Sequence, residues 1–233
     1  LYERYCRECE KQRKIKNVTR KGLRDWYNGY YTKSGERVYK PRSVVFALQF
    51  NNLANYWTSS GPYDEIYYYI RNNVSDVRDD LALMAAGESV SAKIQEYAAT
   101  SMNLSTRDEI YSAMVVYGFL SYLNGKVSIP NRELMEKFDE LLMKNESLGY
   151  VYRLAKESEK MLKATLAGDT HTMEKILELV HDTEVPLLSY NHETELSAIV
   201  NLVYLAARDS YRVEREDKAG VGYVDFIFYP YEK

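Results

Sequence analysis

The chain has 233 residues, of which 45% are hydrophobic and 28% are charged, and its formal net charge is −3 at pH 7. These values are typical of a folded globular protein and exclude a largely disordered one. No apolar run reaches the roughly 18 residues of a membrane-spanning helix, and residues 1–16 lack the apolar stretch of a signal peptide. We therefore expect a cytoplasmic protein without a membrane partner.

The charge is unevenly distributed along the chain. Residues 1–42 contain 13 Lys or Arg and 5 Asp or Glu, a net charge of +8, which leaves a net charge of −11 for residues 43–233. Such a basic segment is suited to phosphate, nucleotide, nucleic acid or an acidic neighbouring domain, and many charge runs are only solvated helical faces. Composition leaves these alternatives open.

The first third of the chain is expected to be helical, with one short hairpin. The apolar spacing predicts helix over residues 2–28 with a break near Asn17, a hairpin over 30–39, and a helix from Pro41 to about Trp57. Gly29 is well placed to end the first helical stretch. Residues 58–62, with two Ser, a Gly and a Pro, form the best early domain boundary.

The middle of the chain contains a specific hairpin signal, Asn124-Gly125, between two short apolar runs. Around it we expect helices over 64–72, 75–86, 106–117 and 132–144, the last capped by Asn131, and an extended segment near 88–97. Two helices flanking a hairpin suggest a winged-helix-like module. Because its hairpin carries only Lys126 as a base, we expect the module to pack within the protein or to contact a protein partner, in preference to reading DNA.

The last third is expected to combine three helices with two strands. The helices are predicted over 150–167, over 172–181, and from Asn191 or His192 through Ala207, the last apolar almost all round and therefore buried. Residues 212–214 and 221–229 read as strands joined across 217–220. The fold class is therefore α+β and mostly helical.

The sequence lacks residues that several common kinds of site require. Cys6 and Cys9 form one C-x-x-C without the further soft ligands that zinc needs, and we expect two reduced cysteines on a helix. The three histidines show no helical metal-ligand spacing. The chain contains no phosphate-binding loop, no dinucleotide fingerprint and no serine nucleophile elbow.

Two carboxylates near the end of the chain remain as candidates. Glu195 lies on the predicted buried helix, and Asp225 lies within the apolar strand Gly222-Tyr223-Val224-Asp225-Phe226. A carboxylate among apolar residues is costly unless it binds a metal or hydrogen-bond donors. Two oxygen ligands from different elements are suited to Mg²⁺. A first-turn helix carboxylate and a solvent-facing strand residue are the structural alternatives.

Two groups of segments carry a resemblance to a known family. Trp26-Tyr27-Asn28-Gly29-Tyr30 and Val38-Tyr39-Lys40-Pro41-Arg42-Ser43 resemble the segments that close the ATPase-like domain of a bacterial family. In that family an AAA-ATPase-like domain precedes a nuclease-fold domain of the PD-(D/E)XK superfamily. Residues 195–198, 211–216 and 220–226 resemble its nuclease segment, whereas residues 60–190 are only loosely similar.

The resemblance implies three regions and a metal site. They are a lid-like segment of an ATPase-like domain over 1–58, a winged-helix-like module over 62–146, and a helical linker with the start of a nuclease-like core over 147–233. Glu195 and Asp225 match the family's catalytic and Mg²⁺-binding carboxylates. Its E-x-K strand should follow Asp225 and is missing before Lys233, while Glu216-Asp217-Lys218 precedes Asp225 and is expected to lie in the hairpin turn. ATP would bind in an ATPase domain upstream of Leu1.

The leading expectation is the C-terminal portion of an ATPase-linked, Mg²⁺-dependent nuclease-like protein that acts on DNA, with no cleavage by these 233 residues alone. The competing expectation is a non-catalytic interaction module that couples an ATPase domain to a protein partner. Self-association is left open. If the nuclease assignment holds, the carboxylates of Glu195 and Asp225 should lie within about 10 Å, a separation that one hydrated Mg²⁺ can bridge.

Overall fold

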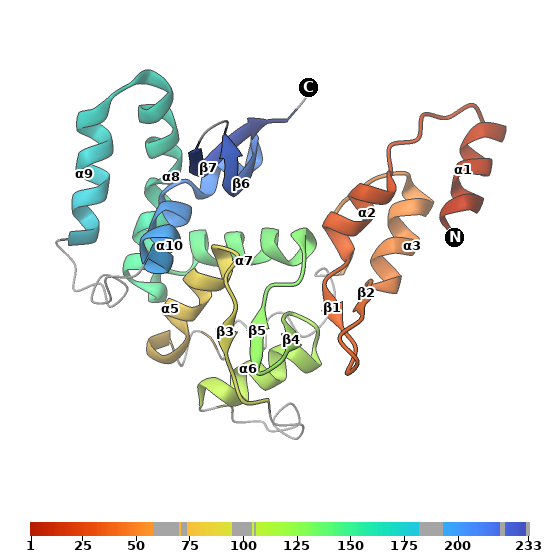
Figure 1. Cartoon of the computed structure of the whole chain (residues 1–233), viewed down its shortest axis with the longest axis horizontal. Helices are drawn as coiled ribbons and strands as arrows, with labels where there is room; N and C mark the ends of the chain where they lie inside the picture. The colour runs from red at the N-terminus through yellow and green to blue at the C-terminus, as the bar shows by residue number, and fades with distance from the viewer. Residues whose placement is uncertain are drawn as a thin grey trace. The chain divides into compact units, whose positions relative to one another are not determined.

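The computed structural model describes residues 1–57, 70, 74–94, 104, 106–181, 193–219 and 222–231, with residues 74–76, 180–181, 215–219 and 222–225 described by their backbone. The fold is α+β and mostly helical, which confirms the expected class (Figure 1). The chain divides into two compact units, Leu1–Leu141 and Leu142–Lys233. No helix among the described residues is long and apolar enough to cross a bilayer.

Three helices and a small hairpin begin the first unit. They are α1 (Tyr2–Lys11), α2 (Arg20–Tyr27), β1 (Tyr30–Tyr31), β2 (Arg37–Val38) and α3 (Pro41–Phe50). Thr19 caps α2 by accepting a hydrogen bond from the amide of Gly22. Buried side chains of these helices and of the segment between α1 and α2 form one apolar cluster, whose members are Tyr5, Cys9, Val18, Leu23, Tyr27 and Ala47. Cys6 and Cys9 are both free thiols on α1, as expected.

Helix α3 ends at Phe50, seven residues before the predicted end at Trp57. Asn51 adopts the left-handed conformation (φ 52°, ψ 39°) and so terminates the helix. The side chain of Asn51 also ties the helix end to the N-terminal segment, because its Oδ1 accepts from the Tyr5 hydroxyl and from the Asn17 amide. These tertiary hydrogen bonds outweigh the apolar spacing that favoured a longer helix.

The rest of the first unit surrounds a three-stranded antiparallel sheet with the order β3-β5-β4. Its elements are α5 (Val74–Ala85), β3 (Val90–Ser91), α6 (Arg107–Val116), β4 (Ser121–Leu123), β5 (Lys126–Ser128) and α7 (Arg132–Lys144). Asn124 and Gly125 turn the hairpin with φ of 50° and 79°, as the Asn-Gly pair predicts. The predicted helix over 64–72 lies almost entirely outside the described residues.

Local caps and one polar cluster fix the elements around this sheet. Thr106 and Glu109 form a capping box at the start of α6. Asn131 caps α7 as expected, by accepting from the amide of Leu134 at 3.2 Å. Asp80 of α5 accepts hydrogen bonds from Arg107 and Tyr111 of α6. Together these contacts hold α5 and α6 in register.

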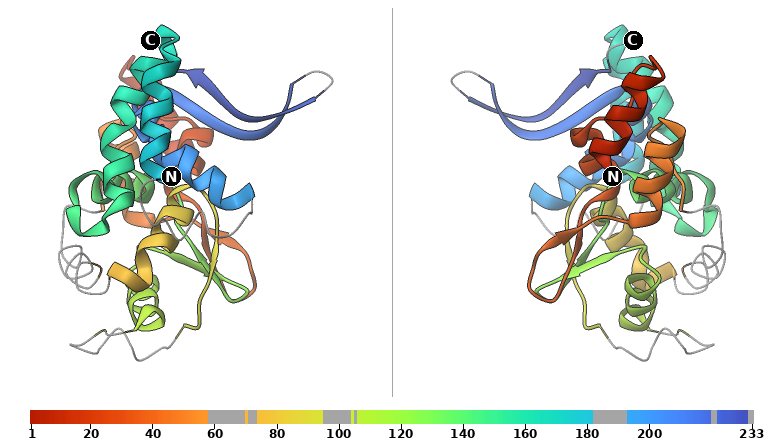
Figure 2. Two further views of the ribbon diagram at one scale, coloured as in Figure 1. Left: turned by 90° about the vertical axis from the view of Figure 1, so that its left-hand side faces the viewer. Right: turned by 90° about the vertical axis from the view of Figure 1, so that its right-hand side faces the viewer.

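Among its described residues, the second unit contains three α-helices, two 3₁₀ turns and a long hairpin. They are α8 (Tyr150–Ala167), α9 (Thr170–His181), α10 (Glu193–Val203), the 3₁₀ turns η2 (Glu146–Leu148) and η4 (Leu205–Asp209), and the strands β6 (Tyr211–Ala219) and β7 (Gly222–Pro230). Helix α8 packs against α9, α10 and η4, and η4 also packs against β6. Figure 2 shows β6 and β7 as a two-stranded ribbon whose turn end extends away from α8.

Two predicted boundaries in this unit are wrong. The helix predicted through Ala207 ends at Val203, because the amide of Ala206 donates to the Ser158 hydroxyl on α8 and the chain continues as a 3₁₀ turn. The first strand extends to Ala219, because Asp217, Lys218 and Ala219 pair with Val224, Tyr223 and Gly222. Glu216-Asp217-Lys218 therefore lies on a strand and not in the turn.

Candidate functional site

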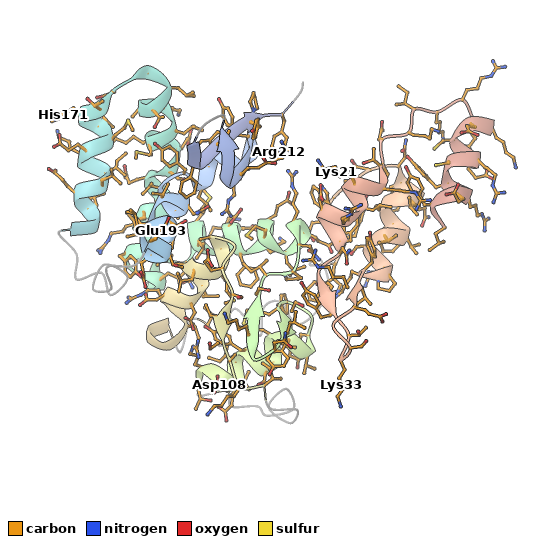
Figure 3. All side chains as sticks on the ribbon, viewed as in Figure 1. Lys21, Lys33, Asp108, His171, Glu193 and Arg212 are labelled. Carbon is orange, nitrogen blue, oxygen red and sulfur yellow. The ribbon has the colours of Figure 1, made fainter. Side chains whose placement is uncertain are left out.

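Glu195 is the third residue of α10, and its Oε2 atom is buried. Within the described part of the chain, this oxygen accepts no hydrogen bond. Two residues earlier, the exposed Glu193, labelled in Figure 3, begins the same helix. A buried carboxylate oxygen without a donor costs free energy, so this atom is a candidate metal ligand.

A short series of hydrogen-bonded polar residues follows Glu195 on the buried side of the same helix. The side-chain amide of Asn201 donates to the Ser197 carbonyl at 2.8 Å, and the Arg208 guanidinium donates to the Asn201 carbonyl oxygen at 3.3 Å. The Ser197 hydroxyl is itself buried and has no hydrogen-bond partner among the described residues. These contacts fix the buried side of α10 beyond Glu195.

Asp225 lies in β7, between Val224 and Phe226, which pair with Asp217 and Arg215 of β6. For Asp225 the structure describes the backbone and its place in this strand. Glu195 and Asp225 belong to the same compact unit, as the candidate site requires. The expected separation of about 10 Å between their carboxylates stays a prediction. Among the described residues, no three His, Cys, Asp or Glu side chains are grouped as metal ligands.

The first unit contains a buried polar site that the sequence did not predict. Glu133, in the first turn of α7, has no exposed surface. Its Oε1 accepts hydrogen bonds from the Ser43 hydroxyl at 2.8 Å and from the backbone amides of Tyr56 at 2.8 Å and Trp57 at 3.1 Å. The backbone carbonyl of Glu133 accepts from the Asn55 side chain at 2.8 Å. One glutamate thus holds α3 and residues 55–57 against α7.

Lys40 lies beside this glutamate, between aromatic rings. Its Nζ is 3.6 Å from the ring centroid of Trp57 and 5.2 Å from that of Tyr30. Trp57 in turn packs edge-on against Phe119, with ring centroids 4.8 Å apart. An ammonium over aromatic faces is stabilised by the ring quadrupoles, which partly replaces the water lost on burial.

Two close backbone approaches complete the cluster. The Tyr30 hydroxyl donates to the Gly118 carbonyl at 2.9 Å, and a Cβ atom at Gly118 would lie 2.6 Å from the Lys40 Nζ. Gly29 has φ of 118°, and a Cβ atom there would lie 1.9 Å from the Pro130 carbonyl oxygen. The backbone contact requires the absence of a side chain at Gly29, and the positive φ of 75° favours glycine at Gly118.

Burial dominates the electrostatics of this cluster. Desolvation raises the pKa of Glu133, although its hydrogen bonds to Tyr56, Ser43 and Trp57 and the charge of Lys40 oppose the rise. Desolvation lowers the pKa of Lys40 to about 8, against the attraction of Glu133. Burial also raises the pKa of the Tyr30 hydroxyl. Burial thus disfavours the charged form of each of the three groups.

The sequence contained part of the signal for this cluster. Tyr30, Lys40 and Ser43 lie in the segments that carry the family resemblance, whereas Glu133 resembles any first-turn helix carboxylate. Nothing local to residues 131–135 distinguishes a buried glutamate from a solvated one. Because the amine of Lys40 is enclosed by rings, the arrangement is suited to joining elements more than to covalent chemistry.

Comparison with known proteins identifies no relative of this chain. No family model, no curated protein and no solved structure matches this chain.

Proposed function

We propose that this chain belongs to an ATPase-linked, Mg²⁺-dependent nuclease-like protein of the PD-(D/E)XK superfamily that acts on DNA. The observation that carries the proposal is the buried Oε2 of Glu195, which lacks a hydrogen-bond donor in the described structure. It lies on the helix that precedes the β6–β7 hairpin, and that hairpin contains Asp225. The order of helix, strand and strand is the one that the resemblance implies.

The donor set fits the proposed metal. Carboxylate oxygens are the ligands that Mg²⁺ prefers, and an unpaired buried oxygen is a ready first ligand. Glu195 and Asp225 would hold the ion. When bound, Mg²⁺ polarises a phosphodiester and activates a water molecule. The contacts of Asn201 with Ser197 and Arg208 would keep the helix that carries Glu195 in one orientation.

The first unit supports the ATPase-linked part of the proposal. Its order of α5, β3, α6 and the β4–β5 hairpin, with sheet order β3-β5-β4, agrees with a winged-helix-like module. The segments that resemble the end of an ATPase-like domain pack against the same unit through Ser43, Tyr30 and Gly29. A lid-like segment joined to a winged-helix-like module is the arrangement that this assignment needs.

Mn²⁺ binding to the purified chain tests the metal site without relying on cleavage. We expect calorimetry to detect one Mn²⁺ site whose affinity falls at least about tenfold in Glu195→Gln and in Asp225→Asn, because each substitution removes a charged ligand. Glu193→Gln, two residues away on the same helix and exposed, is the matched control and should bind like the wild type. Equal titrations for all four proteins would contradict the proposal.

The second candidate function is a non-catalytic module that transmits the state of an ATPase domain to a protein partner. The Glu133 contacts favour it, because they join residues 43, 55, 56 and 57 to α7 within one unit. Hydrogen exchange tests it: Glu133→Ala should increase exchange both in residues 53–57 and in the β4–β5 hairpin. If the chain does not bind Mn²⁺ and Glu133→Ala increases exchange in both regions, the interaction module is favoured over the nuclease.

A further inference from the structure

One side of α3 and the segment after it carry three aromatic rings beside a base: Phe50 is exposed, and Phe46 and Tyr56 are half-buried. We call Arg42, Phe46, Phe50 and Tyr56 the aromatic stripe. The Phe46 and Phe50 centroids are 5.9 Å apart, and the Phe50 and Tyr56 centroids are 6.0 Å apart with an angle of 27° between the ring planes. The Arg42 guanidinium lies 5.4 Å over the Phe46 ring. Phe50 is 60% exposed.

The spacing of these residues explains why the rings face outward. Ser43 and Ala47, one helical turn apart, are buried and turn one side of α3 toward the unit. Residues 42, 46 and 50 follow the same four-residue spacing on another side of the helix. The Phe50 ring is therefore the exposed end of a group of neighbouring rings.

The charge around the stripe is positive. Arg37 and Arg42 are exposed, and residues 37–57 contain no Asp or Glu. Glu133, which accepts a hydrogen bond from Ser43 on the other side of the helix, is fully buried. The stripe therefore combines ring faces with a local excess of positive charge.

The carboxylates of the neighbouring helix α1 do not cancel this charge. Each of them pairs with a base: Glu3 with Arg20, Glu8 with Lys11 at 3.6 Å, and Glu10 with Lys16 at 3.1 Å. The net charge of +8 over residues 1–42 already counts these carboxylates, so it attracts a polyanion over the long range.

We propose that the aromatic stripe binds single-stranded nucleic acid, with bases stacked on Phe50 and its neighbouring rings and phosphates beside Arg42. Every base has a face that stacks on an aromatic ring, and positive charge beside the rings attracts the backbone. A duplex hides its base faces, so the stripe should prefer single strands. The stripe belongs to the first unit, and this binding requires no metal.

The test is fluorescence anisotropy of a labelled 12-nucleotide dT strand with the purified chain in EDTA. We expect binding that weakens as salt rises, and about tenfold weaker binding by Phe50→Ala, because stacking on one ring contributes about 1–3 kcal/mol per base. Phe50→Trp should retain the affinity. Leu166→Ala, which shortens another exposed apolar side chain on α8, is the matched control and should bind like the wild type.

Further measurements separate the alternatives. Heparin binding should be equal in wild type and Phe50→Ala, because the polyanion needs the charge and not the ring. EDTA removes any metal, so the result does not depend on the proposed nuclease site. Equal dT affinity for wild type and Phe50→Ala would overturn the proposal. It would also be overturned if Phe50→Ala abolished self-association or capture of an acidic protein while leaving dT binding unchanged.

Discussion

The hydroxyl of Ser43 on α3 lies 2.8 Å from one carboxylate oxygen of Glu133 on α7 and 2.9 Å from the other. These two residues are 90 positions apart in sequence, and both are fully buried. Their contact joins the first turn of α3 to the first turn of α7. The stability of the first unit should therefore depend on this single carboxylate.

Glu133→Ala should lower the free energy of unfolding of the first unit by about 3 kcal/mol, because two backbone amides and a buried hydroxyl lose their acceptor. Glu133→Gln should cost only about 1 kcal/mol, since the amide keeps an acceptor oxygen and removes a buried charge. Urea unfolding followed by tryptophan fluorescence measures both, because Trp26 and Trp57, the two tryptophans of the chain, lie in this unit.

Glu136→Ala is the control for these variants. Glu136 lies on the same helix, three residues further on, and is exposed. We expect a change within about 0.5 kcal/mol, as for most surface substitutions. A similar loss of stability in Glu136→Ala and Glu133→Ala would contradict the assigned role of Glu133.

The stability of the first unit should rise with pH between about 7.5 and 9.5 relative to a Lys40→Met variant. The pKa of Lys40 is lowered to about 8 in the folded protein, so the unfolded chain binds more protons in this range. The penalty for burying the charged amine is complete below pH 8 and is relieved as the pH rises toward the unfolded value. The expected gain is about 1–2 kcal/mol.

This pH dependence is measured as the difference between urea midpoints of wild type and Lys40→Met at each pH. Lys21→Met is a matched control, because Lys21 is an exposed lysine on α2 and should show no such trend. If the urea midpoints of wild type and Lys40→Met change with pH in parallel, the amine titrates in the folded protein as it does in the unfolded chain.

Gly29→Ala should destabilise the first unit by at least about 3 kcal/mol, because the added Cβ atom would meet the Pro130 carbonyl oxygen at 1.9 Å and the residue has φ of 118°. Gly35→Ala is the matched comparison. It also has positive φ, 83°, but its Cβ atom would meet nothing within 4 Å, so we expect a cost of about 1 kcal/mol. Equal costs at the two glycines would indicate that the contact with Pro130 relaxes.

The purified chain should neither cleave supercoiled plasmid with Mg²⁺ nor bind Mg·ATP with micromolar affinity. The sequence contains no E-x-K after Asp225 and no phosphate-binding loop. Gel assays and calorimetry measure the two activities. Cleavage that is lost in Asp225→Ala would direct attention to Glu216-Asp217-Lys218, which lies on strand β6.

The sequence by itself determined the elements whose signals are local. The Asn124-Gly125 turn, the Asn131 cap and helix 150–167 were predicted correctly, because turn conformation, capping and apolar period depend on residues close together in the chain. The α+β class follows from the same patterns. The choice of Glu195 and Asp225 also came from the sequence, through their apolar surroundings and the resemblance.

Tertiary structure alone decided where several elements end and which carboxylate is buried in the first unit. Asn51 ends α3 early because its side chain bonds to Tyr5 and Asn17, and Ser158 takes the amide of Ala206 that would extend α10. Glu133 finds its donors on residues 43, 56 and 57, about 80 positions away. The free energy of such bonds depends on partners that only the folded chain brings together, so no local pattern can encode them.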